Sequence, residues 1–216
     1  MRRCTLGGFL LWLCGAPAPA AAQRVTIGPE VGVAQYREVA SSLRYSGVGP
    51  GAAATATWRR LRADAAVVSM RMTPASGGAA TQSFRATEID AWLGWDALDY
   101  LRFEVGLTRR SPDSDFAAQS LGAVRVGAAT HYLLGPGATI SLRGDYLAGA
   151  RFSGGGSAPL ALELGLGLDV ELSRRLHAAV RYAFERLDRR TNPGGGAEAS
   201  VPIERSLARV GLAAGF

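Results

Sequence analysis

The chain has 216 residues and a formal net charge of +6, and all 24 of its basic residues are arginine. This length allows one large domain or two small ones, and the two cysteines, Cys4 and Cys14, leave residues 23–216 without thiol or disulfide chemistry. The arginines are scattered along the chain rather than gathered in a basic block, which disfavours a nucleic-acid partner. The sequence contains no run of about 18 apolar residues, so it does not predict a membrane-spanning helix.

The first 22 residues are typical of a secretory signal peptide. Arg2 and Arg3 give a basic start, residues 6–13 are mostly apolar, and residues 20–22 are small alanines suited to cleavage before Gln23. We therefore expect an exported protein with a cleaved signal over 1–22 and one folded domain over 23–216.

The rest of the chain alternates apolar and polar residues with a period of two, which predicts β-strands. Clear alternation covers residues 24–37, 101–107, 124–132, 140–152, 159–173, 176–185 and 206–216, and a less regular pattern covers 82–95. The region 51–73 can be one strand, or two strands over 52–61 and 64–73 around a turn near Arg62. Two strands there give ten in total, and an even number places both chain ends on one side. We predict ten strands, with eight as the alternative.

The connections between these strands alternate in length. Residues 96–99, 135–137 and 173–175 are tight turns, whereas 38–52, 110–117, 153–158 and 187–202 are longer and rich in turn-forming residues. Short connections at one end and longer ones at the other are typical of outer-membrane barrels, which have short periplasmic turns and longer external loops.

The segment 159–173, PLALELGLGLDVELS, indicates which face of the sheet lies outside. A strand of about 13 residues is roughly 44 Å long, and at a tilt near 45° it can cross an apolar band about 25 Å tall. Its other face carries glycines with Glu163 and Asp169, and glycine weakens a strand that faces water. We expect the leucines to face lipid and the charges to face a lumen. A soluble periplasmic barrel with the leucines inside is the alternative.

Charged residues on the polar faces predict a network inside the barrel. A barrel of about eight strands is just filled by its side chains, so we expect these charges to plug the lumen. The alternative is a narrow pore for ions or small solutes, in which the same charges set ion preference. The predicted network consists of Glu30, Glu88, Arg102, Glu104, Arg125, Arg143, Asp145, Glu163, Asp169, Arg181 and Arg209.

Two further sets of residues are expected near the membrane surfaces. Outward aromatic rings favour the membrane interface; this set is Trp58, Trp95, Tyr132, Phe152, Tyr182, Phe184 and Phe216. Arginine binds phosphate through two hydrogen bonds, so arginines at the loop-side ends of the strands are candidates for contact with lipopolysaccharide. They are Arg37, Arg109, Arg110, Arg151, Arg186, Arg189 and Arg190.

The last eleven residues, SLARVGLAAGF, resemble the final strand of Gram-negative outer-membrane β-barrel proteins. Val210, Leu212 and Phe216 match the alternate apolar positions and the terminal Phe of that strand, whereas Ala214 stands where a bulkier residue is common. The resemblance implies an all-β, closed antiparallel transmembrane barrel over 23–216, located in the outer membrane. It also implies that the outer-membrane assembly machinery reads Phe216, Leu212 and Val210.

The sequence offers little for catalysis or for a cofactor. His131 and His177 lie near the short-turn ends of their strands, away from the outer mouth where a lipid-modifying or proteolytic barrel would need its site. Asp113 and Asp115 are too few for calcium, which takes six to eight oxygens. We therefore expect no enzyme, no metal and no cofactor. The expected role is structural, or an interaction at the cell surface through the loops 38–52 and 187–202.

Overall fold

The computed structural model describes residues 23–192 and 199–216. The predicted signal peptide over 1–22 and the middle of the predicted loop 187–202 lie outside the described residues. The strands follow the alternation of the sequence, and each described strand is 12 to 17 residues long. Strands of this length can cross an apolar band about 25 Å tall when they tilt.

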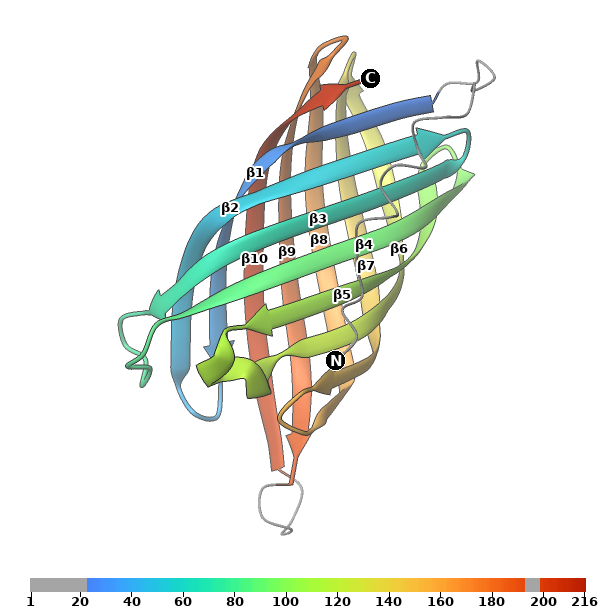
Figure 1. Cartoon of the computed structure of the whole chain (residues 1–216). Helices are drawn as coiled ribbons and strands as arrows, with labels where there is room; N and C mark the ends of the chain where they lie inside the picture. The colour runs from blue at the N-terminus through green and yellow to red at the C-terminus, as the bar shows by residue number, and fades with distance from the viewer. Residues whose placement is uncertain (1–22, 193–198) are drawn as a thin grey trace, which may run out of the picture.

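Ten antiparallel strands close into one barrel (Figure 1). Each strand pairs with its neighbours in chain order, and β1 closes the barrel by pairing with β10 from Thr26 opposite Gly215 to Glu38 opposite Ile203. The prediction of ten strands rather than eight is confirmed. The strands are β1 (Gln23–Glu38), β2 (Leu43–Trp58), β3 (Leu61–Pro74), β4 (Phe84–Leu98), β5 (Leu101–Pro112), β6 (Leu121–Gly135), β7 (Ala138–Phe152), β8 (Ser157–Ser173), β9 (Leu176–Thr191) and β10 (Ala199–Gly215).

The predicted hairpin in the region 51–73 is present, but its turn was misplaced. The turn is at Arg59 and Arg60, where Arg59 has a φ of 54°, and Arg62 already belongs to β3. β2 also begins nine residues earlier than predicted, at Leu43, so most of the predicted loop 38–52 is strand. Residues 47–56 are mainly glycine and alanine. Such residues give no contrast of polarity between the two faces, so the period of two is hidden there.

The two ends of the barrel differ in their connections, as expected. At one end, called the turn end below, two-residue turns separate β2 from β3, β4 from β5, β6 from β7 and β8 from β9. The opposite end, the loop end, has longer connections, among them residues 75–83 and a short 3-10 helix, η2 (Ser114–Gln119). The C-terminus lies at the turn end, at the top of Figure 1. The predicted loop 187–202 is shorter than expected, because β9 continues to Thr191 and β10 starts at Ala199.

The apolar face of the sheet is the outer face. On β8, Leu164 and Leu166 are 61% and 48% exposed, whereas Glu163 between the outward leucines is 6% exposed. The same parity holds on β5, where Val105 and Leu107 are exposed and Glu104 is buried. The prediction that the leucines face outward and the charges inward is therefore confirmed. In the part of the chain that the structure describes, no helix is long and apolar enough to span a membrane.

Candidate functional site

A single arginine joins four strands across the middle of the lumen. Arg125 on β6 is buried and donates hydrogen bonds to Asp90 Oδ1 on β4 at 3.1 Å and to Asp145 Oδ2 on β7 at 3.0 Å. It also donates to Glu163 on β8. Since β4 and β8 each lie two strands away from β6, these two bonds pass over an intervening strand on the lumen side of the wall. We call this arrangement the Arg125 clamp.

Further arginines complete the middle layer. The Arg143 Nη2 donates to Glu163 Oε1 at 2.8 Å, and the Arg209 Nη1 lies 3.2 Å from Asp90 Oδ2. Trp92 lies in the same layer, with the guanidinium carbons of Arg125 and Arg143 at 5.5 and 5.0 Å from its ring centroid. Buried charges are costly unless they are paired and hydrogen-bonded. The number of partners in this layer explains how so many charges are accommodated.

A second charged layer lies toward the loop end. The Arg110 Nη2 donates to both carboxylate oxygens of Glu185, at 3.1 and 3.0 Å, and the Arg110 Nε lies 3.5 Å from Glu88. Arg205 on β10 forms an ion pair with Glu88 on β4, across the barrel. Two arginines and two glutamates therefore balance each other in this layer.

All eleven residues of the predicted lumen network face the interior or line its cavities. Sequence reasoning missed Arg62 and Asp64, which are joined by two hydrogen bonds of 2.7 and 3.0 Å. The misplaced turn is the cause, because it put Arg62 in a loop. Arg110 was wrongly assigned to the outer rim: it is inward, and the parity of β5 beyond Leu107 could have shown this.

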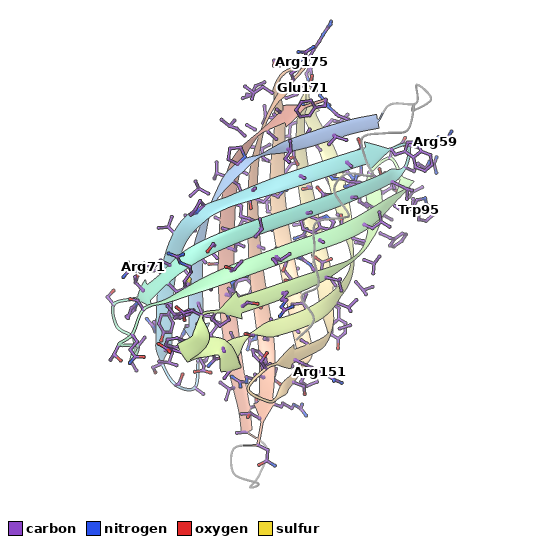
Figure 2. The ribbon with its side chains drawn as sticks, viewed as in Figure 1. Arg59, Arg71, Trp95, Arg151, Glu171 and Arg175 are labelled. Carbon is purple, nitrogen blue, oxygen red and sulfur yellow. The ribbon has the colours of Figure 1, made fainter. Side chains whose placement is uncertain are left out.

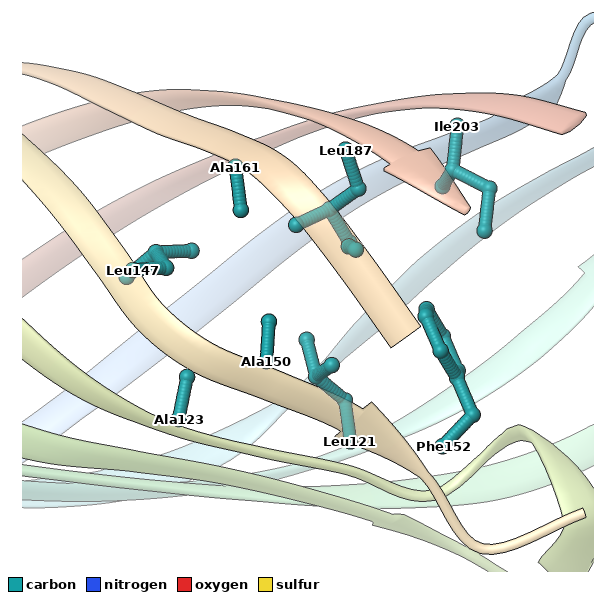
Figure 3. Packing of buried hydrophobic residues seen from close by; sticks show 9 residues of the cluster. Leu121, Ala123, Leu147, Ala150, Phe152, Ala161, Leu187 and Ile203 are labelled. Atoms are coloured by element: carbon teal, nitrogen blue, oxygen red, sulfur yellow. The ribbon is translucent and has the colours of Figure 1, made fainter. Parts of the chain in front are cut away.

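The loop-side part of the lumen is apolar, which was not predicted. Two clusters of buried residues lie there, one between β6, β7, β8, β9 and β10 and one between β1, β2, β3, β4 and β10. Figure 3 shows the first cluster, in which Leu121, Phe152, Leu187 and Ile203 converge between the strands. Phe84 and Phe116 stack at 4.4 Å between centroids and extend the second cluster to η2. These buried side chains lie in the lumen on the loop side of the charged layers.

The prediction that Phe152 is an outward interfacial ring is wrong: Phe152 is 7% exposed and belongs to the first apolar cluster. The register of β6 and β7 shifts between Gly122 and Val124, opposite Gly149, which has a φ of 63°. A bulge with glycine in this conformation adds one residue to a strand and exchanges its faces. Odd residues of β7 therefore point inward before Gly149, and even residues do so after it.

The other six predicted interfacial aromatics face outward. Trp58, Trp95, Tyr132 and Phe216 are 44% to 79% exposed and lie at the turn end, where Figure 2 shows Trp95 beside the turn at Arg59. Tyr182 and Phe184 also face outward, but they lie near the middle of β9. Outward aromatic side chains therefore gather at the turn end of the barrel, and the two at the middle of β9 do not form a second belt.

Two polar cavities occupy the turn-side half of the lumen, with volumes of about 310 and 280 Å³. They share Arg62, Asp169, Arg181 and Arg209 as lining residues. Inward glycines such as Gly167 and Gly211 leave this space, because they place no side chain in the lumen. The cavities reach as far as Arg143 and Arg209, in the layer of the Arg125 clamp.

The two histidines of the described residues line these cavities. His177 Nε2 lies 2.9 Å from an Nη2 atom of Arg24, whose guanidinium also pairs with Glu171 at 3.0 Å. His131 lines the second cavity. Within the described ranges there is no group of three or more His, Cys, Asp or Glu side chains placed to hold a metal ion.

Five of the seven predicted rim arginines face outward near the loop end. Figure 2 shows Arg151 there, together with Arg71 on the other side of the barrel. Arg189 faces inward, like Arg110: it lies over the Phe152 ring at 4.4 Å and donates to Gln119 Oε1 at 3.2 Å. The outward members are Arg37, Arg109, Arg151, Arg186 and Arg190.

No protein-family model and no curated protein sequence matches this chain. Among solved structures, it is similar to Neisserial surface protein A, at 12% identity over 89% of this chain and 97% of that one, with a TM-score of 0.44. It is similar to the outer membrane protease OmpT from Escherichia coli, at 11% identity, 90% and 96% coverage and a TM-score of 0.47. An outer membrane channel from Pseudomonas putida F1 matches at 10% identity, 93% and 97% coverage and a TM-score of 0.46. Similarities with such low identities and TM-scores do not indicate a role for this chain.

The fold itself is informative about the environment. Lipid offers no hydrogen bonds to a backbone, and a closed barrel satisfies every strand within its own wall. The described strands form such a wall, with apolar side chains outside and charges enclosed. This is a membrane-spanning β-barrel, the class of structure that resides in bacterial outer membranes.

Proposed function

We propose that the protein is an integral outer-membrane barrel with a closed lumen, which has a structural role or acts through interactions at the cell surface. The observation that carries this proposal is the Arg125 clamp, in which one buried guanidinium binds carboxylates from β4, β7 and β8. A solute would have to break these bonds to pass. Breaking a buried ion pair by removing one partner costs about 3–5 kcal/mol.

The apolar clusters support the same proposal. Beyond the charged layers, Leu121, Leu187, Ile203 and Leu207 are at most 2% exposed. Ions and polar solutes avoid such a segment, because it offers no groups to replace their hydration. The turn-side cavities would then form a water-filled space that is open to one side only.

Conductance across a planar bilayer tests the closed lumen. We expect the refolded barrel to give no steady single-channel steps, while a general porin in the same bilayer provides the positive control. Heat-modifiable gel mobility of the same sample would show that the inserted protein is folded. Regular steps from the wild-type barrel would overturn the proposal and support the alternative, a narrow pore for ions or small solutes.

We further propose that the barrel is not an enzyme that modifies lipid or cleaves peptides. His131 and His177 line turn-side cavities, whereas such substrates reach a barrel at its outer mouth or outer leaflet. The folded protein is expected to show no hydrolysis of a peptide library or of phospholipid esters. Turnover that is lost in a His131→Ala or His177→Ala variant would contradict this.

The proposed partners are lipopolysaccharide and the outer-membrane assembly machinery. Arg37, Arg109, Arg151, Arg186 and Arg190 face outward near the loop end, where an outer leaflet presents its phosphates. The barrel is expected to bind lipopolysaccharide vesicles more tightly than phosphatidylethanolamine vesicles, with a preference that weakens as salt rises. Equal binding to both lipids would refute this part of the proposal.

A further inference from the structure

Four charged residues form one row across the outer wall near the loop end. Arg44 on β2 is paired in register with Arg37 on β1, Arg37 with Glu204 on β10, and Glu204 with Arg186 on β9. Glu204 is the carboxylate of this row, and it is 3.9 Å from the Arg37 Nη1 and 3.8 Å from the Arg186 Nη1. Two of the three guanidinium groups therefore pair with the one carboxylate, and the row has an excess of positive charge.

The juxtaposition of Arg37 and Arg44 is unfavourable in the barrel alone. Side chains that are directly opposite on neighbouring antiparallel strands lie about 4.5–5.5 Å apart at Cβ, and like charges in such a pair destabilise the sheet. The Arg44 Nε is also buried and, among the described residues, has no hydrogen-bond partner. A buried donor without a partner loses its hydration without compensation. Both features point to an anion that occupies this position when the protein is in its membrane.

The next two rows toward the membrane centre change their chemistry in order. The second row consists of Ser46, Gln35, Ser206 and Phe184 on the same four strands. The third row consists of Val48, Val33, Ala208 and Tyr182. Rows that are two residues apart lie about 7 Å apart along the strand. The outer wall therefore passes from charged, through uncharged hydrogen-bonding, to apolar within about 14 Å.

A groove of about 470 Å³ lies over this part of the wall. Its lining includes Arg37 and Arg44 of the first row, Gln35, Ser46, Ser206 and Phe184 of the second, and Tyr182 of the third. Ala75 and Ser76, from the connection between β3 and β4, lie at the same groove. The charge, the unpaired donor and the three rows thus coincide in one concave site.

We infer that this groove is a specific site for a phosphorylated glycolipid of the outer leaflet. Arg37 and Arg44 would bind its phosphate, since arginine pairs with phosphate oxygens through two hydrogen bonds. Gln35, Ser46 and Ser206 match the hydroxyl and amide groups of a sugar headgroup, and the third row matches the start of its acyl chains. The inference rests on the proposed outer-membrane location, and it goes beyond a diffuse attraction between the arginine rim and lipid phosphates.

The test compares two double variants of the full barrel that lose the same charge on different parts of the wall. In Arg37→Gln/Arg44→Gln the groove loses both guanidinium groups; in Arg109→Gln/Arg151→Gln two outward arginines of β5 and β7 are lost instead. Titration with diphosphorylated lipid A in a detergent without sugar groups is the assay, with dephosphorylated lipid A and inorganic phosphate as further probes. Gel mobility with and without heating verifies that each variant is folded.

The site predicts saturable binding of one lipid A per barrel. Because hydrogen bonds to charged groups contribute more than neutral ones, binding is expected to weaken about tenfold or more in the Arg37/Arg44 variant and less than about threefold in the Arg109/Arg151 variant. Dephosphorylated lipid A should bind as weakly as the first variant does. An Arg37→Lys/Arg44→Lys variant keeps the charge but loses the paired hydrogen bonds, and it should give an intermediate affinity.

Each failure has a distinct meaning. Equal losses in the two double variants would overturn the specific site and leave the diffuse rim. Full competition by inorganic phosphate at the lipid's own concentration would show a free-anion site instead of a lipid site. If the wild-type barrel does not bind lipid A and does not prefer lipopolysaccharide vesicles, the proposed partner is itself wrong. If the first variant does not fold, the lysine variant and the dephosphorylated lipid still decide the matter.

Discussion

Arg125 and Asp90 meet inside the lumen although their strands, β6 and β4, are separated by β5: the Nη1 of Arg125 lies 3.1 Å from Asp90 Oδ1. Both side chains are almost completely buried. The pair joins two strands that share no backbone hydrogen bonds, so it restrains the barrel wall in a way that strand pairing alone does not. It therefore connects the interior chemistry of the barrel to its stability.

Removal of this guanidinium should destabilise the barrel severely. In Arg125→Ala, Asp90, Asp145 and Glu163 lose a shared partner, and we expect the free energy of unfolding to fall by about 3–5 kcal/mol. Urea-induced unfolding in lipid vesicles measures this change. Arg109→Ala, on the outer wall, is the control and should change the free energy by less than about 1 kcal/mol. Equal effects of the two substitutions would show that the clamp has no special role.

Gly149, at the bulge of β7, has a φ of 63°. We expect this backbone conformation to require glycine. No atom lies within 4 Å of a Cβ placed at Gly149, so Gly149→Ala tests backbone conformation without a steric clash. We expect a loss of about 1–2 kcal/mol, the cost of a left-handed conformation for an L-residue. Gly144→Ala, on the same strand but without a positive φ, is the matched control. It should be neutral or slightly stabilising.

The terminal residue should matter for assembly more than for stability. Phe216 is 79% exposed, and its backbone N–H donates to the Val25 carbonyl at 2.9 Å, which a different side chain would preserve. Phe216→Ser should therefore refold in detergent as well as the wild type does. In cells it should lower the amount of heat-modifiable barrel in the outer membrane severalfold. Normal assembly of this variant would remove the case for recognition of the final strand.

Much of this architecture could be predicted because burial here depends on parity. Leu164 and Glu163 are adjacent in a strand, so they had to face opposite sides of the sheet. The predicted strand was also long enough to cross the apolar part of a membrane. The errors arose where parity fails or carries no information. Gly149 exchanges the faces of β7, so Phe152 turned out to be inward, and the glycine and alanine run of β2 hid the start of that strand and the turn after it. Arg110 faces inward because β5 is a regular strand as far as Pro112.

The groove at Arg37 and Arg44 could not be predicted, because it depends on register. Periodicity states which residues face outward, but the residue that lies opposite on the neighbouring strand is set by turn length and bulges. The loop-side apolar clusters were missed for a similar reason. Leu121 and Leu187 lie on the inward face of their strands, which otherwise carries polar residues, and they are buried because side chains from five strands pack together there.

A charge on the outer wall should be costly in proportion to its depth. Leu164 lies near the middle of β8 and Leu172 near its turn end. Leu164→Arg is expected to destabilise the barrel in a bilayer by about 2–4 kcal/mol, and Leu172→Arg by about 0–1 kcal/mol. Equilibrium unfolding from vesicles provides both values. Similar small costs at the two positions would indicate water rather than hydrocarbon outside β8.

Spin labelling of β8 measures the environment of its two faces most directly. Residues 23–216 contain no cysteine, so Leu164→Cys and Gly165→Cys would each carry a single label, the first outward and the second inward. In vesicles, the label at 164 should collide readily with oxygen, which concentrates in hydrocarbon, and hardly at all with a water-soluble nickel chelate. The label at 165 should be poorly accessible to oxygen. A label at 164 that is quenched by the nickel chelate, or the reverse pattern at the two positions, would contradict a lipid-facing leucine wall around enclosed charges.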